Sequence, residues 1–190
     1  MNKMRVGVIG CGMVAKSYLN TLQKFSHIEL GACADLMPER AQQIAAEYQF
    51  KRSCSPGELL KGDDCDMVLN LTIPAAHCEV NLAILEAGKH VYSEKPLGIK
   101  LREAEQVLAK AKEKGLRVGC APDTFLAGGH QHSRQLVEAG TIGRPLAAFG
   151  TVCGHGPDAY HANPHFFYEE GAGPMLDQGV YVITALLPLF

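Results

Sequence analysis

Short apolar runs and amphipathic stretches alternate along the chain through residue 121. The apolar runs are nearly continuous, which is typical of strands covered on both faces, and they lie at 4–9, 28–34, 65–71, 91–93 and 116–121. Between them, apolar positions recur at helical spacing in 13–24, 38–48, 74–87 and 100–114, with a shorter helix at about 55–61. This alternation predicts βαβ units with right-handed crossovers, and therefore an α/β fold with a Rossmann-type doubly wound parallel sheet.

The pattern changes after residue 121. The following sequence predicts a helix at about 128–139, a strand-like segment at 146–153, a loop rich in Gly, His and Pro, and an almost wholly apolar stretch at 174–190. We therefore divide the chain into a nucleotide-binding domain, 1–122, and the start of a truncated α+β substrate domain, 123–190. Because 180–190 carries no charge and is too short to span a bilayer, we expect it to pack on further sequence, as in a fragment of a longer protein.

Composition and charge exclude several classes of protein. The 190 residues are 47% hydrophobic and 20% charged, as in an ordinary globular protein. Eighteen basic and 20 acidic side chains give a net charge of −2, so no basic surplus favours nucleic acid or a membrane surface. The 7 cysteines form no C-x-x-C pair and no zinc-type cluster with histidine. We expect reduced thiols, no metal and a cytoplasmic location.

The first strand leads into a glycine pattern that can bind phosphate. Gly10-Cys11-Gly12-Met13-Val14-Ala15 reads G-x-G-x-x-A at the start of a helix. Gly10 permits a tight turn, Gly12 lets the backbone approach a pyrophosphate, and the free N–H groups of the helix bind its charge. The alternative interpretation is a purely structural turn.

Asp35 ends the second strand, about twenty residues beyond the glycine pattern. A carboxylate there accepts hydrogen bonds from the ribose 2′-hydroxyl of NAD and repels the 2′-phosphate of NADP. NAD is therefore the expected cofactor and NADP the less favoured one, although the nearby Arg40 could meet a phosphate. A surface aspartate without a ligand is the alternative.

Two further strand ends carry candidate ligand-binding residues. Thr72, Pro74 and His77 follow the third long strand, and Glu94-Lys95-Pro96 follows the next. Ligands of doubly wound sheets bind at the carboxyl ends of the strands. A lysine in this place can hold a substrate oxygen and stabilise negative charge that develops on it. The alternative for E-K-P is an exposed turn.

Taken together, these motifs resemble the Gfo/Idh/MocA oxidoreductases, the family of glucose–fructose oxidoreductase and inositol dehydrogenase. The matching segments occur in order: G-C-G-M-V-A at 10–15, Asp35, T-I-P-A-A-H at 72–77, G-K-H-V at 88–91, E-K-P-L at 94–97, R-Q-L-V-E-A-G-T-I-G-R-P at 134–145 and G-A-G-P-M-L-D-Q-G-V-Y at 171–181. The resemblance implies a Rossmann domain that binds the nicotinamide cofactor and an α/β domain that covers the substrate and mediates oligomerisation.

The resemblance also implies roles for individual residues. Lys95 matches the catalytic lysine, and Asp177 matches the aspartate of G-x-x-x-D-x-x-x-H. Tyr181 replaces the commoner histidine, as in glucose–fructose oxidoreductase-like members. On a regular helix it projects from the same face as Asp177, so it can serve as the general acid/base. A core aromatic is the alternative for Tyr181.

Histidines in the second half suggest a polar pocket rather than a metal site. His161 and His165 are four residues apart, but Pro164 between them disfavours a regular helix. We assign His161 to the substrate pocket, together with Lys95 and Asp177.

The expected protein is an NAD-dependent dehydrogenase acting on a secondary alcohol or ketone of a sugar, polyol or sugar derivative, and a homo-oligomer at full length. The predicted cofactor-binding residues are Gly10, Cys11, Gly12, Met13, Val14, Asp35, Thr72, Pro74, His77, Glu94 and Lys95. Two alternatives stay open: an NAD-dependent glycoside hydrolase that uses transient oxidation, and a non-enzymatic cofactor-sensing regulator or inactive fragment.

Overall fold

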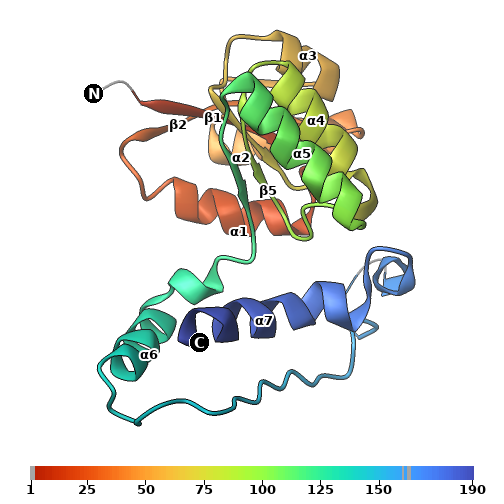
Figure 1. Ribbon diagram of the computed structural model, residues 1–190. Helices are drawn as coiled ribbons and strands as arrows, with labels where there is room; N and C mark the ends of the chain where they lie inside the picture. Colours follow the sequence, from red (N-terminus) through yellow and green to blue (C-terminus); the bar gives the residue numbers. More distant parts are fainter. Residues whose placement is uncertain (1–2, 160, 162–163) are drawn as a thin grey trace. The chain divides into compact units, whose positions relative to one another are not determined.

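The computed structural model describes residues 3–159, 161 and 164–190. The chain forms two compact units, Met1–Cys120 and Ala121–Phe190 (Figure 1).

The first unit is built on a parallel six-stranded sheet with the strand order β3-β2-β1-β4-β5-β6. The strands are β1 Met4–Ile9, β2 Ile28–Ala34, β3 Arg52–Cys54, β4 Met67–Asn70, β5 His90–Ser93 and β6 Val118–Cys120. This order is that of the doubly wound Rossmann fold, so the predicted fold class is confirmed. The short edge strand β3 was not predicted, because its Arg-Ser-Cys sequence carries no apolar run.

Helices cover both faces of this sheet. They are α1 Met13–Leu22, α2 Pro38–Tyr48, α3 Pro56–Lys61, α4 His77–Glu86 and α5 Leu101–Lys114. Leu19 of α1 and Ile44 of α2 pack with β1 in one buried cluster, while Leu59 of α3, Ile84 of α4 and Val107 of α5 pack in a second. Val14 is exposed, because Ala15 and Leu19 form the buried face of α1.

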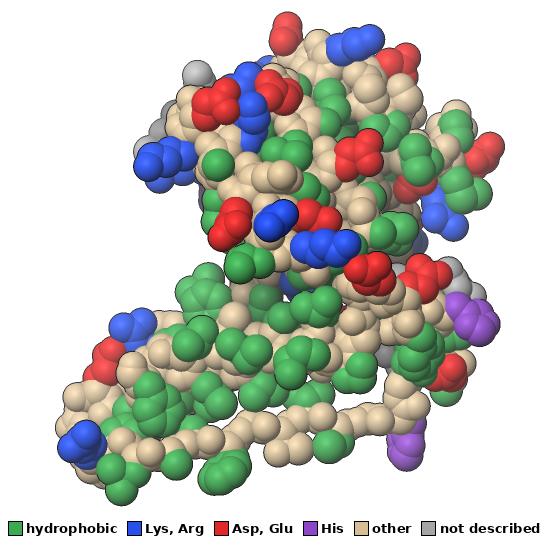
Figure 2. Space-filling view, turned by 45° about the vertical axis from the view of Figure 1, so that its right-hand side comes forward, with side chains coloured by type: hydrophobic (Ala, Val, Ile, Leu, Met, Phe, Trp, Pro, Cys, Tyr) green, Lys and Arg blue, Asp and Glu red, His purple; other side chains and the backbone are tan. Residues whose placement is uncertain are grey.

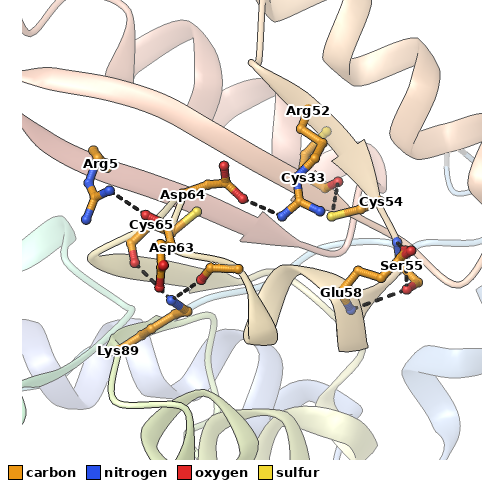
Figure 3. A network of polar contacts seen from close by, with 11 residues as sticks. Arg5, Cys33, Arg52, Cys54, Ser55, Glu58, Asp63, Asp64, Cys65 and Lys89 are labelled. Carbon is orange, nitrogen blue, oxygen red and sulfur yellow. Dashed lines mark hydrogen bonds and ion pairs between the residues drawn. The ribbon is translucent and has the colours of Figure 1, made fainter.

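Polar contacts tie the loop before β4 to its neighbours (Figure 3). The ammonium group of Lys89 is buried and donates to the carbonyl oxygens of Gly62 at 2.8 Å and Cys65 at 3.1 Å. Arg5 binds the Asp66 carboxylate, and contact with the guanidinium lowers the pKa of Asp66. Lys89, which belongs to the G-K-H-V segment of the family motifs, thus has a structural role in this loop.

All the regular structure described in the second unit is helical. Its elements are the 3₁₀ turn η2 Thr124–Leu126, α6 Gly128–Glu138, the 3₁₀ turn η3 Pro164–Tyr168, the π turn η4 Met175–Gly179, α7 Val180–Leu186 and the 3₁₀ turn η5 Leu187–Leu189. The strand predicted at 146–153 was wrong: this segment has no regular structure. A strand needs a neighbour for its backbone hydrogen bonds, and the described part of this unit contains none.

Many large apolar side chains of the second unit are exposed (Figure 2). Phe149 is 97% exposed and Leu146 is 85% exposed, and several residues of the last helical segment are also accessible. Gly150, which follows Phe149, lies directly against Val182 of α7. Among the described residues, no helix combines the length and apolar character that crossing a membrane requires.

Candidate functional site

The carboxyl ends of β1, β2, β4 and β5 meet in register at one edge of the sheet. Ile9 is paired with Ala34 on one side and with Asn70 on the other, and Asn70 is paired with Ser93. The residues that follow these four strand ends include Gly10, Asp35, Thr72 and Glu94. This edge spans the switch point between β1 and β4, where doubly wound sheets bind ligands. The structure therefore brings together the candidate residues of the first unit.

Gly10 and Gly12 differ in the space that a side chain would have at each position. Gly10 has a left-handed backbone with φ of 99°, and a Cβ there would lie 2.5 Å from the Leu71 carbonyl oxygen. The fold itself therefore requires glycine at this position. A Cβ on Gly12 would meet no protein atom within 4 Å. The open space at Gly12 leaves the backbone accessible to a ligand.

The amino terminus of α1 is suited to an anion. It has no capping side chain and no acidic residue in its first turn. The other helices of the sheet, α2 to α5, each carry a glutamate there, namely Glu39, Glu58, Glu79 and Glu103. Because the first N–H groups of a helix lack partners inside it and carry a partial positive charge, the start of α1 fits a pyrophosphate group.

Asp35 is hydrogen-bonded to the glycine loop. Its Oδ2 accepts from the amide of Cys11 at 2.8 Å, and its Oδ1 accepts from the amide of Met37 at 2.9 Å. Each carboxylate oxygen can accept a further hydrogen bond, so the group can still bind a hydroxyl. The Cys11 thiol is buried, and contact with the Cys33 thiol raises its pKa. Cys11 thus offers its backbone rather than a thiolate to this site.

A buried polar network lies beneath the ends of β4 and β5. Asn70, His77, Asn81 and Ser93 are each no more than 1% exposed. The Asn70 amide donates to Asn81 Oδ1 at 2.8 Å, and the Asn81 amide donates to Ser93 Oγ at 3.1 Å. Sequence reasoning missed Asn70, Asn81 and Ser93. The one available signal was a polar residue inside an apolar run, since Asn70 lies between Met67-Val68-Leu69 and Leu71.

His77 connects two loops of the site. Its Nδ1 lies 2.6 Å from the Pro96 carbonyl oxygen, and its Nε2 lies 3.0 Å from that of Thr72. The imidazole is thus enclosed between the loop after β4 and the loop after β5. Both ring nitrogens face protein atoms, so the geometry favours a role in holding these loops, whereas sequence reasoning assigned His77 to the cofactor.

Glu94 binds two groups of its own chain. Its Oε1 accepts from the Tyr18 hydroxyl at 2.7 Å, and its Oε2 accepts from the backbone amide of Lys95 at 3.0 Å. Lys95 itself is half-buried at this edge. The carboxylate therefore joins α1 to the segment that carries the candidate catalytic lysine.

The remaining candidates belong to the second unit. Asp177 is half-buried in the π turn, and its carboxylate accepts from Gln178 Nε2 at 2.8 Å. Tyr181 is half-buried in the first turn of α7. The regular helix assumed for this pair is thus interrupted by the wider π turn around Asp177. The grouping of Lys95 with Asp177 and Tyr181 stays a prediction.

His161 is half-buried, and its ring packs edge-on against Phe167 with 4.8 Å between centroids. Within the described ranges, no three His, Cys, Asp or Glu side chains are grouped in a way that could hold a metal.

Two family models match the chain. The one described as "Oxidoreductase family, NAD-binding Rossmann fold" matches residues 4–121. The one described as "GFO/IDH/MocA C-terminal domain" matches residues 130–190.

Individual relatives agree with these models. The 1,5-anhydro-D-fructose reductase of Ensifer adhaerens is 33% identical over 145 residues, covering 76% of this chain and 44% of that protein. The dTDP-3,4-didehydro-2,6-dideoxy-alpha-D-glucose 3-reductase of Actinomadura kijaniata is 34% identical over 191 residues, covering 97% and 55%. The chain thus spans about half the length of these relatives.

Among solved structures, scyllo-inositol dehydrogenase from Lactobacillus casei, with bound NAD(H) and scyllo-inositol, matches with a TM-score of 0.70 and 23% identity. The match covers 75% of this chain and 43% of that one. At this identity the match shows the fold.

Proposed function

Because the chain belongs to the Gfo/Idh/MocA oxidoreductase family, we propose that its protein transfers a hydride between NAD and a secondary alcohol or ketone of a sugar, polyol or sugar derivative. The observation that carries the proposal is the set of strand ends in register, which gathers the glycine loop, Asp35 and Lys95 at one edge of an NAD-binding Rossmann domain.

The first unit supplies the cofactor site. The backbone from Gly10 to Val14 holds the pyrophosphate at the start of α1, supported by the open space at Gly12. Asp35 accepts from the adenosine ribose, supported by the free acceptor capacity of its two oxygens. Thr72, Pro74 and Glu94 border the same edge. NAD, when bound, supplies the nicotinamide that accepts or returns the hydride.

We assign the handling of the reacting alcohol to Lys95, Tyr181, Asp177 and His161. Lys95 donates to the substrate oxygen and stabilises the negative charge that develops on it. Tyr181 carries the proton as the hydride leaves or arrives, and Asp177 orients the substrate or Tyr181. His161 lines the pocket for the remaining hydroxyl groups. The assignments of Lys95 and Asp177 follow from the family motifs E-K-P and G-x-x-x-D, and Tyr181 takes the place of the histidine four residues later. His161 is assigned from its position in the loop rich in Gly, His and Pro.

The proposal extends to the substrate class, the oligomeric state and the cellular location. The named relatives act on an anhydrosugar and a nucleotide-linked deoxysugar, which supports a sugar or polyol as substrate. The apolar side chains exposed on the second unit support a homo-oligomer. All 7 cysteines are free thiols, which supports the reducing environment of the cytoplasm.

The first test is a fluorescence titration of the chain with NADH and with NADPH. We expect NADH to bind at least about tenfold more tightly, because Asp35 repels a 2′-phosphate. A folded chain, shown by circular dichroism, that binds neither nucleotide would overturn the proposed cofactor site.

Turnover is then measured on the full-length gene product as NADH formation with inositols, hexoses and nucleotide-linked sugars. Bond cleavage without net NADH would indicate the glycoside hydrolase instead. Tight cofactor binding without turnover of any of these substrates would favour the regulator.

A further inference from the structure

The packing of the Tyr18 ring directs its hydroxyl toward the Glu94 carboxylate. Tyr18 lies on α1, one and a half turns beyond the proposed pyrophosphate site, and its ring meets Tyr92 of β5 edge-on with 6.1 Å between centroids. The ring also packs on the buried cluster of α1, α2 and β1. Because packing fixes the ring, the 2.7 Å hydrogen bond from Oη to Glu94 Oε1 fixes the carboxylate in turn.

We propose that Tyr18 is a positioning residue for Lys95. Its hydroxyl holds the Glu94 carboxylate against the backbone amide of Lys95, 3.0 Å from Oε2, and so sets the place of the lysine relative to α1. The effect of Tyr18 on catalysis rests on the proposed function, in which α1 binds the cofactor and Lys95 binds the substrate oxygen. Glu94 then acts as a connection inside the protein, although its position suggested cofactor binding.

The hydrogen bond from Tyr18 to the Glu94 carboxylate is strong enough for its loss to affect Lys95. Hydrogen bonds to a carboxylate are stronger than those between neutral groups, and Glu94 is half-buried, so the loss of one donor is poorly replaced by water. Without the hydroxyl, the carboxylate can rotate away from the Lys95 amide. A displacement of about 1 Å at a reacting group can cost about 100-fold in rate.

The test is Tyr18→Phe, which removes only the hydroxyl and keeps the packed ring. Hydrogen exchange of the Lys95 amide, followed by NMR, reports how well the hydrogen bond to Glu94 protects this amide. We expect exchange about tenfold faster, as for the loss of one hydrogen bond to a charged group. Tyr48→Phe is the matched control, because Tyr48 belongs to the buried cluster on which Tyr18 packs and also donates through its hydroxyl, here to Asn20 Oδ1 at 3.1 Å. Tyr48→Phe should leave the exchange rate of the Lys95 amide unchanged.

A double-mutant cycle checks that Glu94 carries the effect. Glu94→Ala should accelerate exchange at Lys95 at least as much as Tyr18→Phe, and combining the two should add nothing further. Unchanged exchange in Tyr18→Phe, equal acceleration in Tyr48→Phe, or full additivity with Glu94→Ala would each overturn the inference.

Turnover separates the inference from the proposed function. In the full-length gene product, Tyr18→Phe should lower kcat while the dissociation constant for NADH stays within about twofold, because the start of α1 is untouched. If Lys95→Ala retained full turnover, the catalytic role of Lys95 would fail, while the exchange result at the Lys95 amide would still decide the structural connection.

Discussion

The carboxylate of Asp35 accepts a hydrogen bond from the backbone amide of Cys11 at 2.8 Å, and this contact joins the end of β2 to the glycine loop after β1. The residue proposed to select the nucleotide therefore also helps to shape the loop that binds its pyrophosphate. A substitution at Asp35 is therefore expected to affect both the choice of nucleotide and the shape of the glycine loop. Different substitutions can separate these two effects.

We predict that Asp35→Ala weakens NADH binding by about tenfold or more, since it removes both the ribose acceptor and the bond to Cys11. Asp35→Asn removes the charge but keeps one acceptor oxygen. It should retain more of the NADH affinity and improve the relative binding of NADPH, because the repulsion of the 2′-phosphate is gone. Fluorescence titrations with both nucleotides measure this. Equal NADH and NADPH affinities in the unmodified chain would contradict the selector role.

Alanine at Gly10 should reduce the stability of the fold, whereas alanine at Gly12 should reduce the affinity for NADH. Gly10→Ala places a Cβ 2.5 Å from the Leu71 carbonyl on a left-handed backbone, so we expect a loss of about 1–3 kcal/mol in the free energy of unfolding. Gly12→Ala meets no protein atom and should change that free energy by no more than about 0.5 kcal/mol. It should nevertheless weaken NADH binding strongly, because the methyl group fills the space of the pyrophosphate. Urea unfolding and NADH titration of both variants give the comparison, and undiminished binding by Gly12→Ala would place the pyrophosphate elsewhere.

The sequence predicted the first unit well because its signals are local. Apolar runs mark β1, β2, β4, β5 and β6, and the glycine pattern and Asp35 follow directly from strand ends. The connections that hold the site are not local: Tyr18 and Glu94 are 76 residues apart in the chain. No spacing rule points from one to the other, and only the sheet order brings α1 beside the end of β5. The error at 146–153 has a related cause, since a strand depends on a partner that its own sequence does not reveal.

Lys95 is expected to govern turnover rather than cofactor affinity. Lys95→Met should lower kcat by about 100-fold or more, as for the removal of one group that stabilises charge in the transition state. NADH binding should change little, because the pyrophosphate and ribose contacts lie at other strand ends. Lys95→Arg keeps a positive charge, so any activity it recovers measures how far charge alone suffices. The assay is steady-state NADH formation by the full-length gene product with its best sugar or polyol.

An ion-pair cluster between α4 and α5 predicts a defined response to acid. Hydrogen bonds from Lys110 and Lys114 lower the pKa of Glu86 to about 2 from an ordinary 4.5. A lowered pKa in the folded state contributes stability above the ordinary value, and this contribution is lost as pH falls from about 4.5 towards 2. Glu86→Gln should therefore lower the melting temperature slightly at pH 7 and show a smaller further loss over that interval. Because the groups are exposed, 1 M salt should reduce the difference, and a difference unaffected by salt would argue against an electrostatic origin.

The buried amide network beneath the site is expected to matter more for stability than any surface contact. Asn81→Leu keeps the branched shape and the number of side-chain heavy atoms but cannot accept from Asn70 or donate to Ser93. Since Asn81 is fully buried, these partners lose hydrogen bonds that water cannot replace, at a cost of about 1–3 kcal/mol. Asn20→Leu is the control, because Asn20 is exposed and accepts from Tyr48 alone among the contacts described for it. Urea unfolding should show a large loss for Asn81→Leu and a small one for Asn20→Leu. Equal losses would mean that the network is not a major source of the stability that holds the loops after β4 and β5.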